Sequence, residues 1–169
     1  MTIHHEHPFL PPPGQREPAR RLRSLLPSPV SVWASGSGTH RDGWTISSML
    51  VANGDPAELV ALIDEDCDWW DLFQQTGLAT VNVLGPGQGP VSDAFARLTP
   101  SPGGPFRTGT WSDTEHGPKL AGAAAWAGVS LITKDPEHSG WGLLVRVRLD
   151  WIEVADGVSA LEHRSGRYL

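Results

Sequence analysis

The sequence predicts a mainly β protein built as a closed or nearly closed antiparallel barrel. Three observations carry this prediction: about six β-prone runs, only a few short helices, and a long pair of strands in the last third of the chain. Within residues 142–154, alternate positions are apolar and charged, which indicates a strand with one buried and one solvated face. The face expected to be buried carries Leu143, Val145, Val147, Leu149 and Trp151.

The first half of the chain is expected to contain two short helices and four strands. Residues 16–26 are predicted to be helical, because Pro27 and Pro29 stop any continuation. Asp68 is expected to cap a second helix that runs to about Gln75, with Gly77 as its C-terminal stop. The strands are expected at residues 30–35, 44–51, 58–63 and 78–84.

The second half begins with a short helix over residues 91–98, followed by a long loop over residues 99–118 that is rich in Pro, Gly, Ser and Thr. A loop of this length inside a compact domain is usually functional or part of an interface. Long strands are predicted at residues 121–133 and 142–154, and a short final strand at 160–163.

Composition restricts the classes of function that fit. The chain has 169 residues, and we expect a flexible tail over residues 1–14 and a single domain over 15–169. The net charge is −6 with only two lysines, which does not favour nucleic-acid binding. There is no apolar run of the roughly 20 residues that span a membrane, and no signal-peptide core. A lone cysteine, Cys67, agrees with a reducing compartment, so a cytoplasmic protein is expected.

Familiar catalytic motifs are missing from the sequence. The stretch from Gly36 to Arg41 starts like a dinucleotide fingerprint, but it lacks the third glycine and precedes a strand instead of a helix. There is no P-loop, no G-x-S-x-G elbow and no H-E-x-x-H motif. The carboxylates between Asp64 and Asp71 are interpreted as stabilising a helix N-terminus, and Cys67 there as an ordinary thiol. No residue is therefore assigned a catalytic or metal-binding role.

Two other motifs do point to a function. The run from Gly43 to Leu50 places Thr45, Ser47 and Ser48 almost side by side in a β-prone segment. Such a strand offers a ligand both backbone groups and hydroxyl donors. About thirty residues further on, the segment Gly-Leu-Ala-Thr-Val-Asn-Val-Leu over residues 77–84 has the pattern of a buried strand.

In this order the two motifs resemble the flavin reductase-like family, the FMN-binding split barrels, through its signatures G-x-T-x-S-S and G-x-x-x-V-N-V-L. The resemblance runs from residue 27 to residue 169. It includes the polar-Pro turn at 53–56, a helix that ends in Phe95-Ala96, and a C-terminal H-x-x-G-x-Y formed by His163, Gly166 and Tyr168. It implies a six-stranded antiparallel split barrel that binds FMN at the interface of a homodimer.

The resemblance also implies a set of site residues. The segment from Trp44 to Ser48 would line the flavin, Asn53 and Gly54 would lie near its ring, and a helix start at Cys67 to Trp69 would take the phosphate. The family usually has Ser and Thr hydroxyls at that helix start, so we expect weaker FMN binding here. Arg41, Arg97 or an arginine of the partner subunit would offset the carboxylates. The expected flavin-binding residues are Trp44, Thr45, Ile46, Ser47, Ser48, Asn53, Gly54, Cys67, Asp68, Trp69 and Arg41, and those on the nicotinamide side are His163, Arg167 and Tyr168.

The function implied by the resemblance is hydride transfer from NAD(P)H to a flavin, with FMN expected and FAD as the alternative. The protein would then be the reductase half of a two-component monooxygenase. Two other interpretations stay open: a flavin- or deazaflavin-linked reductase of another small molecule, and a flavin- or haem-binding module without turnover. The sequence does not distinguish NADH from NADPH as the donor.

Overall fold

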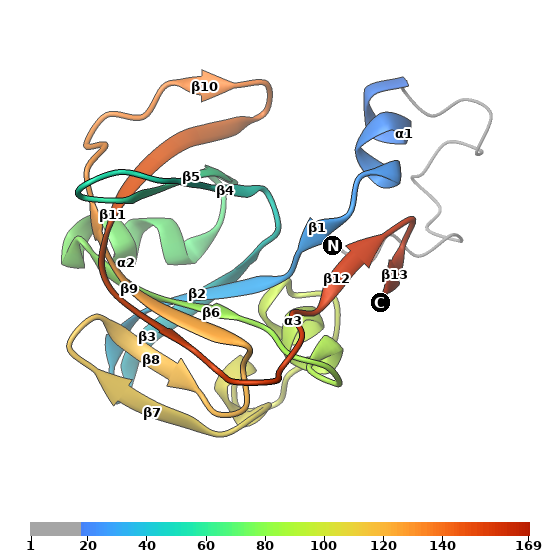
Figure 1. Cartoon of the computed structure of the whole chain (residues 1–169). Coiled ribbons are helices and arrows are strands. Elements are labelled where there is room, and N and C mark those ends of the chain that lie inside the picture. Colours follow the sequence, from blue (N-terminus) through green and yellow to red (C-terminus); the bar gives the residue numbers. More distant parts are fainter. Residues whose placement is uncertain (1–17) are drawn as a thin grey trace.

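The computed structural model describes residues 18–169, which form a strongly curled antiparallel sheet accompanied by helices (Figure 1). The tail expected over residues 1–14 and the start of the helix expected from residue 16 lie outside the described residues. The α-helices are α1 (Pro18–Leu25), α2 (Asp68–Thr76) and α3 (Gly89–Phe95), and a short 3-10 helix spans Pro105–Arg107.

Six strands of six or more residues form the wall of the barrel in the described part of the chain. They are β2 (Ser31–Ser37), β3 (His40–Ile46), β5 (Glu58–Ile63), β6 (Leu78–Val83), β9 (Ala125–Leu131) and β11 (Gly142–Val154). With the short β4 (Met49–Ala52) at one edge, the antiparallel order is β3, β2, β6, β9, β11, β5, β4. Within residues 18–169 the two edge strands, β3 and β4, do not pair with each other, so the barrel is split there. The predicted six-stranded antiparallel split barrel is confirmed.

Smaller sheets flank the barrel. The three-stranded sheet of β1 (Ser28–Pro29), β12 (Glu162–Arg164) and β13 (Arg167–Tyr168) lies beside α1 on one side (Figure 1). The hairpin of β7 (Trp111–Thr114) and β8 (Gly117–Leu120) lies below the barrel in the same view. A two-residue strand, β10 (His138–Ser139), pairs with the start of β11.

Aromatic side chains of α2 and β2 fill the barrel core. Trp33 meets Trp69 edge-on, with ring centroids 6.2 Å apart, and Trp69 stacks on Phe73 at 4.8 Å. All three side chains are fully buried, and burying a large apolar side chain contributes roughly 1.5–3 kcal/mol. This packing fixes α2 against the inner face of β2 and β3. A second apolar cluster, around Leu84, Phe95 and Leu120, lies between α3 and the β7–β8 hairpin.

The second helix ends as predicted but begins differently. Gly77 adopts a left-handed conformation (φ 66°), and its N–H donates to the carbonyl of Phe73 at 2.8 Å, which closes α2. The prediction that Asp68 caps the helix start is wrong. Cys67 is the capping position, it makes no side-chain capping bond, and Asp68 is the first helical residue.

The strand predicted over residues 44–51 is divided in two. β3 starts earlier, at His40, and ends at Ile46, whose carbonyl accepts a hydrogen bond from the Ser31 hydroxyl at 2.6 Å. The carbonyl of Ser48 then accepts from the Leu62 N–H at 2.9 Å, so the backbone leaves β2 and joins β5 as β4. We call Ser47 and Ser48, which connect the two edges of the split barrel, the hydroxyl turn.

The loop predicted over residues 99–118 contains the β7–β8 hairpin instead. Asn82 of β6 holds this hairpin in place, because its side-chain oxygen accepts from the Leu120 N–H at 2.7 Å and its amide donates to the Pro118 carbonyl at 3.2 Å. The Thr80 hydroxyl also donates to the Gly117 carbonyl at 3.0 Å. These partners lie more than 30 residues away, so local composition could not reveal them.

The strict alternation predicted along residues 142–154 fails near its end. The register against β9 shifts between Leu149 and Trp151, as in a β-bulge, which re-aims side chains. Trp151 consequently lies on the outer face over Gly128, where an added Cβ would be 2.0 Å from the indole Nε1. Leu143, Val145 and Val147 are buried as predicted.

Candidate functional site

The hydroxyl turn lies where α1, β5 and the open edge of the barrel meet. Ser47 and Ser48 are half-buried, and the Ser48 hydroxyl accepts a hydrogen bond from the Arg23 guanidinium of α1 at 3.3 Å. The Ser47 hydroxyl makes no hydrogen bond to any described residue and is therefore available to a ligand. The turn thus offers two hydroxyl groups beside a cation.

The C-terminal sheet brings two predicted residues to a neighbouring position. His163 and Tyr168 face each other across β12 and β13, with ring centroids 5.5 Å apart. The Tyr168 hydroxyl donates to the Asp93 carboxylate of α3 at 2.5 Å. Thr45 of β3 donates its hydroxyl to the Ser92 carbonyl on the same helix at 2.7 Å. Helix α3 therefore joins the predicted flavin strand to the predicted nicotinamide-side residues.

Two buried polar atoms at this junction have no hydrogen-bond partner among residues 18–169. They are the Ser92 hydroxyl oxygen and Nε2 of His163. Leaving such a group unpaired costs about 1–3 kcal/mol, so each calls for an explanation such as a ligand. Burial lowers the pKa of His163 below its ordinary value, the nearby Arg23 lowers it further, and Asp93 acts in the opposite direction. His163 is therefore a neutral imidazole at neutral pH.

The start of α2 presents its backbone rather than its side chains to a ligand. Cys67 is 4% exposed and Trp69 is fully buried, with its indole N–H donating to the Ser35 hydroxyl at 3.0 Å. Asp68 is exposed, and Asp64 and Asp66 beside it are also exposed. The Cys67 N–H donates to the Asp64 carbonyl at 3.3 Å, so any contact from this helix start to a phosphate would come from the backbone N–H groups of Asp68 and Trp69, in a negatively charged turn.

The Cys67 thiol is expected to be unreactive in the folded protein. Burial raises its pKa to about 12, so at pH 8 the thiolate is about a thousandfold rarer than for an ordinary cysteine. A disulfide reagent should label Cys67 of the native protein at least about a hundredfold more slowly than Cys67 of the protein unfolded in guanidinium chloride, where one thiol reacts. Rapid labelling of the native protein at pH 8 would show that the turn opens or that the thiol is activated.

The two arginines expected to offset the acidic turn are engaged elsewhere. Arg41 pairs with Asp113 of β7 at 3.7 Å and lies 4.4 Å over the ring of Phe106. Arg97 pairs with Asp42 at 2.7 Å and lies 5.4 Å over Trp44. Each guanidinium therefore already has a carboxylate and an aromatic partner.

The remaining predicted residues are not gathered at the hydroxyl turn by any contact in the structure. Ile46 is buried in the core, directly before the turn. Asn53 and Gly54 are exposed in the connection between β4 and β5, and Arg167 is exposed on β13. The structure thus collects Thr45, His163 and Tyr168 around α3 and places the hydroxyl turn against α1 and β5, while no contact joins the other predicted residues to either group.

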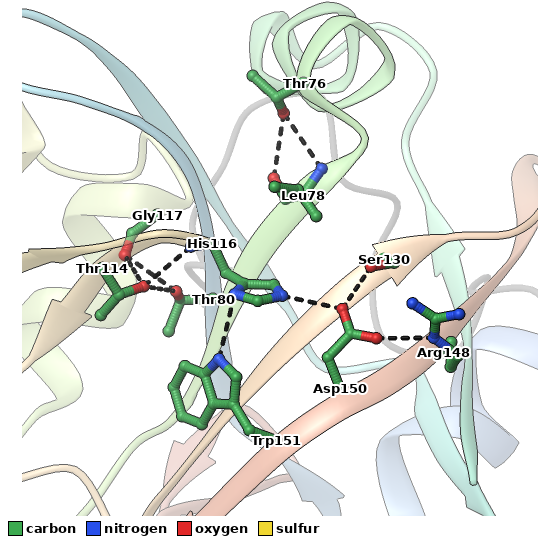
Figure 2. Close-up of polar contacts among 10 residues, drawn as sticks. All are labelled: Thr76, Leu78, Thr80, Thr114, His116, Gly117, Ser130, Arg148, Asp150 and Trp151. Carbon is green, nitrogen blue, oxygen red and sulfur yellow. Dashed lines mark hydrogen bonds and ion pairs between the residues drawn. The ribbon is translucent and has the colours of Figure 1, made fainter. Parts of the chain in front are cut away.

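A second polar cluster, which sequence reasoning missed, lies on the outer face of β9 and β11 (Figure 2). Nε2 of His116 is 2.9 Å from the Asp150 carboxylate, and the Trp151 indole donates to Nδ1 of His116 at 3.1 Å. An indole can only donate, so Nδ1 carries no proton and Nε2–H donates to Asp150. Ser130 and Arg148 also donate to Asp150. Burial alone would raise the pKa of Asp150, but these hydrogen bonds outweigh it and lower the pKa.

This cluster fastens the β7–β8 turn to the barrel rather than forming a catalytic triad. A triad requires a hydrogen bond between nucleophile and base, whereas the Ser130 hydroxyl bonds to the carboxylate and not to His116. The sequence signal was weak because Trp151 reaches His116 only through the bulge in β11.

A cleft of about 350 Å³ adjoins this cluster, but none of the sequence-predicted residues lines it. The cleft lies at the His40 end of β3, whereas the hydroxyl turn follows the Ile46 end. At about 3.3 Å per residue, the two ends of this strand are about 20 Å apart. The cleft is lined by Gly36, Ser37, Thr76, Leu78, Thr114, Glu115, His116 and Gly117.

Two features are absent among residues 18–169. No helix in this part is both long and apolar enough to cross a membrane. The same residues contain no group of three or more histidine, cysteine, aspartate or glutamate side chains that could hold a metal ion.

Comparison with solved structures finds the same fold in several flavin reductases. The NADH:FAD oxidoreductase SgcE6 of Streptomyces globisporus, in complex with NAD and FAD fragments, is 20% identical with a TM-score of 0.80, covering 95% of this chain and 94% of that one. BorF, the flavin reductase component of a bacterial two-component tryptophan halogenase, is 25% identical with a TM-score of 0.76, covering 89% and 96%. The styrene monooxygenase flavin reductase SMOB of Pseudomonas putida is 19% identical with a TM-score of 0.76, covering 89% and 95%. No curated protein sequence matches the chain significantly.

The fold and the junction around α3 together define a split-barrel protein with a cluster of polar side chains around α3. The sequence profile of the flavin reductase like domain matches residues 22–169, nearly the whole of the described chain. The chain therefore belongs to the flavin reductase like family, as the two sequence signatures had indicated.

Proposed function

We propose that this protein is an NAD(P)H-dependent flavin reductase that binds flavin at the hydroxyl turn. The observation that carries the proposal is the junction around α3. There Thr45 bonds to Ser92 and Tyr168 bonds to Asp93, and the Ser92 hydroxyl and Nε2 of His163 are buried without a hydrogen-bond partner among residues 18–169. The hydroxyl turn follows on the same chain segment, directly after Ile46. Membership of the family supports the flavin, and SgcE6, of the same fold, was solved with NAD and FAD fragments.

In the proposed site each group has a definite role. Ser47 and Ser48 donate hydrogen bonds to polar groups of the flavin, and Thr45 sets the position of α3. His163 and Tyr168 face the nicotinamide side, with Arg167 on the same hairpin. Trp44, Ile46, Asn53, Gly54, Arg41 and the backbone of Cys67, Asp68 and Trp69 complete the set proposed from the sequence.

The bound flavin would supply the two-electron redox chemistry, and the chain supplies binding, orientation and shielding from water. No side chain is assigned as a general acid or base. His163 is neutral, so Nε2 can donate to or accept from an uncharged ligand group without bringing a charge into the site. FMN is the proposed flavin, with FAD as the alternative, and weak binding would make it a released substrate.

The proposal extends to partners and location. Exposed apolar side chains lie on and beside the edge strand β4, including Leu50 (74% exposed), Val51 (63%) and Leu62 (40%). An unpaired apolar edge of this kind supports self-association, and a homodimer is proposed. Similar structures include reductase components of two-component enzymes, which supports an oxygenase partner that receives reduced flavin. The proposed location is the cytoplasm.

A flavin titration tests this function. FMN should quench the tryptophan fluorescence saturably, and anaerobic addition of NADH or NADPH should then bleach the flavin absorption band. Quenching without bleaching by either donor would leave a flavin-binding module instead of a reductase. No quenching by FMN or FAD would overturn the proposal altogether.

A further inference from the structure

Arg23 lies at the point where α1 meets the proposed flavin site. It is the only basic residue in the last turn of α1, and its Nη2 donates to the Ser48 hydroxyl at 3.3 Å. The next residue, Ser24, holds the helix end in place, because its carbonyl accepts from both the N–H (2.8 Å) and the hydroxyl (3.2 Å) of Ser165. The guanidinium is thus directed at the hydroxyl turn by a fixed backbone.

Arg23 differs from the four arginines that form ion pairs in having no carboxylate partner among the described residues. Arg41, Arg97, Arg146 and Arg148 each form an ion pair with an aspartate or glutamate. Among residues 18–169, no carboxylate oxygen lies within 4.0 Å of the Arg23 side chain, so its positive charge is not locally neutralised. A guanidinium of this kind can form charge-assisted, two-pronged hydrogen bonds with an anion.

The surroundings of Arg23 also contain an unsatisfied donor or acceptor. Burial and, to a smaller extent, the positive charge of Arg23 lower the pKa of His163, whose buried Nε2 has no hydrogen-bond partner in the described part of the chain. Arg23, the Ser48 hydroxyl and His163 thus come from three separate elements, α1, the hydroxyl turn and β12. Arg23 and the Ser48 hydroxyl, which are in contact, offer a charge and a hydrogen-bonding atom to one ligand group.

The start of α2, which the sequence resemblance had suggested for the phosphate, is electrostatically unfavourable. Asp64, Glu65, Asp66, Asp68 and Asp71 are all exposed around it. Like charges repel a dianionic phosphate, and Arg41 and Arg97 already pair with aspartates. Among the described cations, Arg23 is the one that combines a free guanidinium with contact to the hydroxyl turn.

We propose that Arg23, together with Ser48, binds a phosphate group of the nucleotide held at the hydroxyl turn. This inference rests on the proposed function. The shared ligand chemistry is a phosphate ester, which could belong to the flavin nucleotide or to the nicotinamide dinucleotide. Arg23 then supplies the positive charge that the start of α2 lacks.

The test compares ligands with and without phosphate on Arg23→Gln, Arg23→Lys and a matched control, Arg21→Gln, in the full-length protein. Dissociation constants for FMN, riboflavin, NADH and dihydronicotinamide riboside are measured by fluorescence quenching and calorimetry. Arg23→Gln should lower the affinity for one phosphorylated ligand about tenfold, while the affinity for the phosphate-free counterpart should change less than about twofold. Arg23→Lys should recover part of the lost affinity. The Arg21 side chain makes no hydrogen bond or ion pair with a described residue, and only its backbone carbonyl accepts a bond, from Ser24, so Arg21→Gln should match the wild type.

Each outcome has one meaning. A selective loss for FMN over riboflavin assigns the phosphate to the flavin, and a selective loss for NADH assigns it to the dinucleotide. Equal weakening of phosphorylated and phosphate-free ligands would mean that Arg23 only supports the hydroxyl turn, which overturns the inference. Unchanged affinities overturn it as well, while a wild-type protein that binds none of the four ligands contradicts the proposed function itself.

Discussion

Replacing Ser47 with phenylalanine is expected to abolish flavin binding while the barrel stays folded. Ser47 is half-buried in the hydroxyl turn and makes no hydrogen bond to a described residue, so the fold does not depend on its hydroxyl. An aromatic ring there would occupy the space beside Thr45 and Ser48 that the flavin needs. FMN affinity should fall by about a hundredfold or more, equivalent to roughly 2.7 kcal/mol. Fluorescence quenching gives the affinity, and circular dichroism with a thermal scan shows whether the fold is kept.

The matched control is Ser37→Phe. Ser37 is an exposed serine at the end of β2, and it lines the cleft at the opposite end of the β2–β3 hairpin. FMN affinity should be unchanged in this variant. If Ser37→Phe loses flavin and Ser47→Phe keeps it, the flavin binds in the cleft beside His116, and the hydroxyl turn is not the site.

Replacing Asn82 with alanine is expected to destabilise the protein by about 3–5 kcal/mol. Asn82 is fully buried and makes four hydrogen bonds, which link β6, β2 and the β7–β8 hairpin. Its removal leaves the buried Leu120 N–H without an acceptor, which costs about 1–3 kcal/mol, and adds a cavity in the core. Chemical denaturation should show a lower midpoint with an unchanged slope.

The control for this prediction is Gln75→Ala, which removes an amide of similar chemistry from the exposed surface of α2. Its effect should stay within about 0.5 kcal/mol. A loss of less than about 1 kcal/mol for Asn82→Ala would show that the hairpin does not depend on Asn82. In that case the asparagine of the V-N-V-L signature would need a role in ligand binding instead.

The local sequence pattern was sufficient to predict an element wherever one strand or helix buries a single continuous face. Glu58–Ile63 and Gly142–Val154 lie where alternation and turn residues predicted them, and Gly77 ends α2 as its left-handed conformation requires. The signatures around Ser47 and Asn82 were sufficient to identify the family, because they combine unusual residues with a defined order. These features depend on neighbours in the chain, so the sequence displays them directly.

The candidate site depended on contacts between distant residues. Local pattern did not indicate that β3 would end at Ile46, because the break comes from the hydrogen bonds of Ser31 and Leu62. It also did not place Arg23 beside Ser48, since α1 carries no buried residue and its position is set by Ser165. The bulge in β11 likewise moved Trp151 to the outer face.

The sequence by itself therefore determined the class of fold, the family and the hydroxyl-bearing segment at which a ligand is proposed to bind. Composition, period and motif order are properties of the chain, and folding does not change them. Only the tertiary structure decided which charges remain free. Arg41 and Arg97 were plausible phosphate partners until the fold placed Asp113 and Asp42 against them, while Arg23 was left beside Ser48 without a carboxylate among the described residues. Whether a charge is neutralised depends on neighbours within a few ångströms, and those neighbours come from distant segments of the chain.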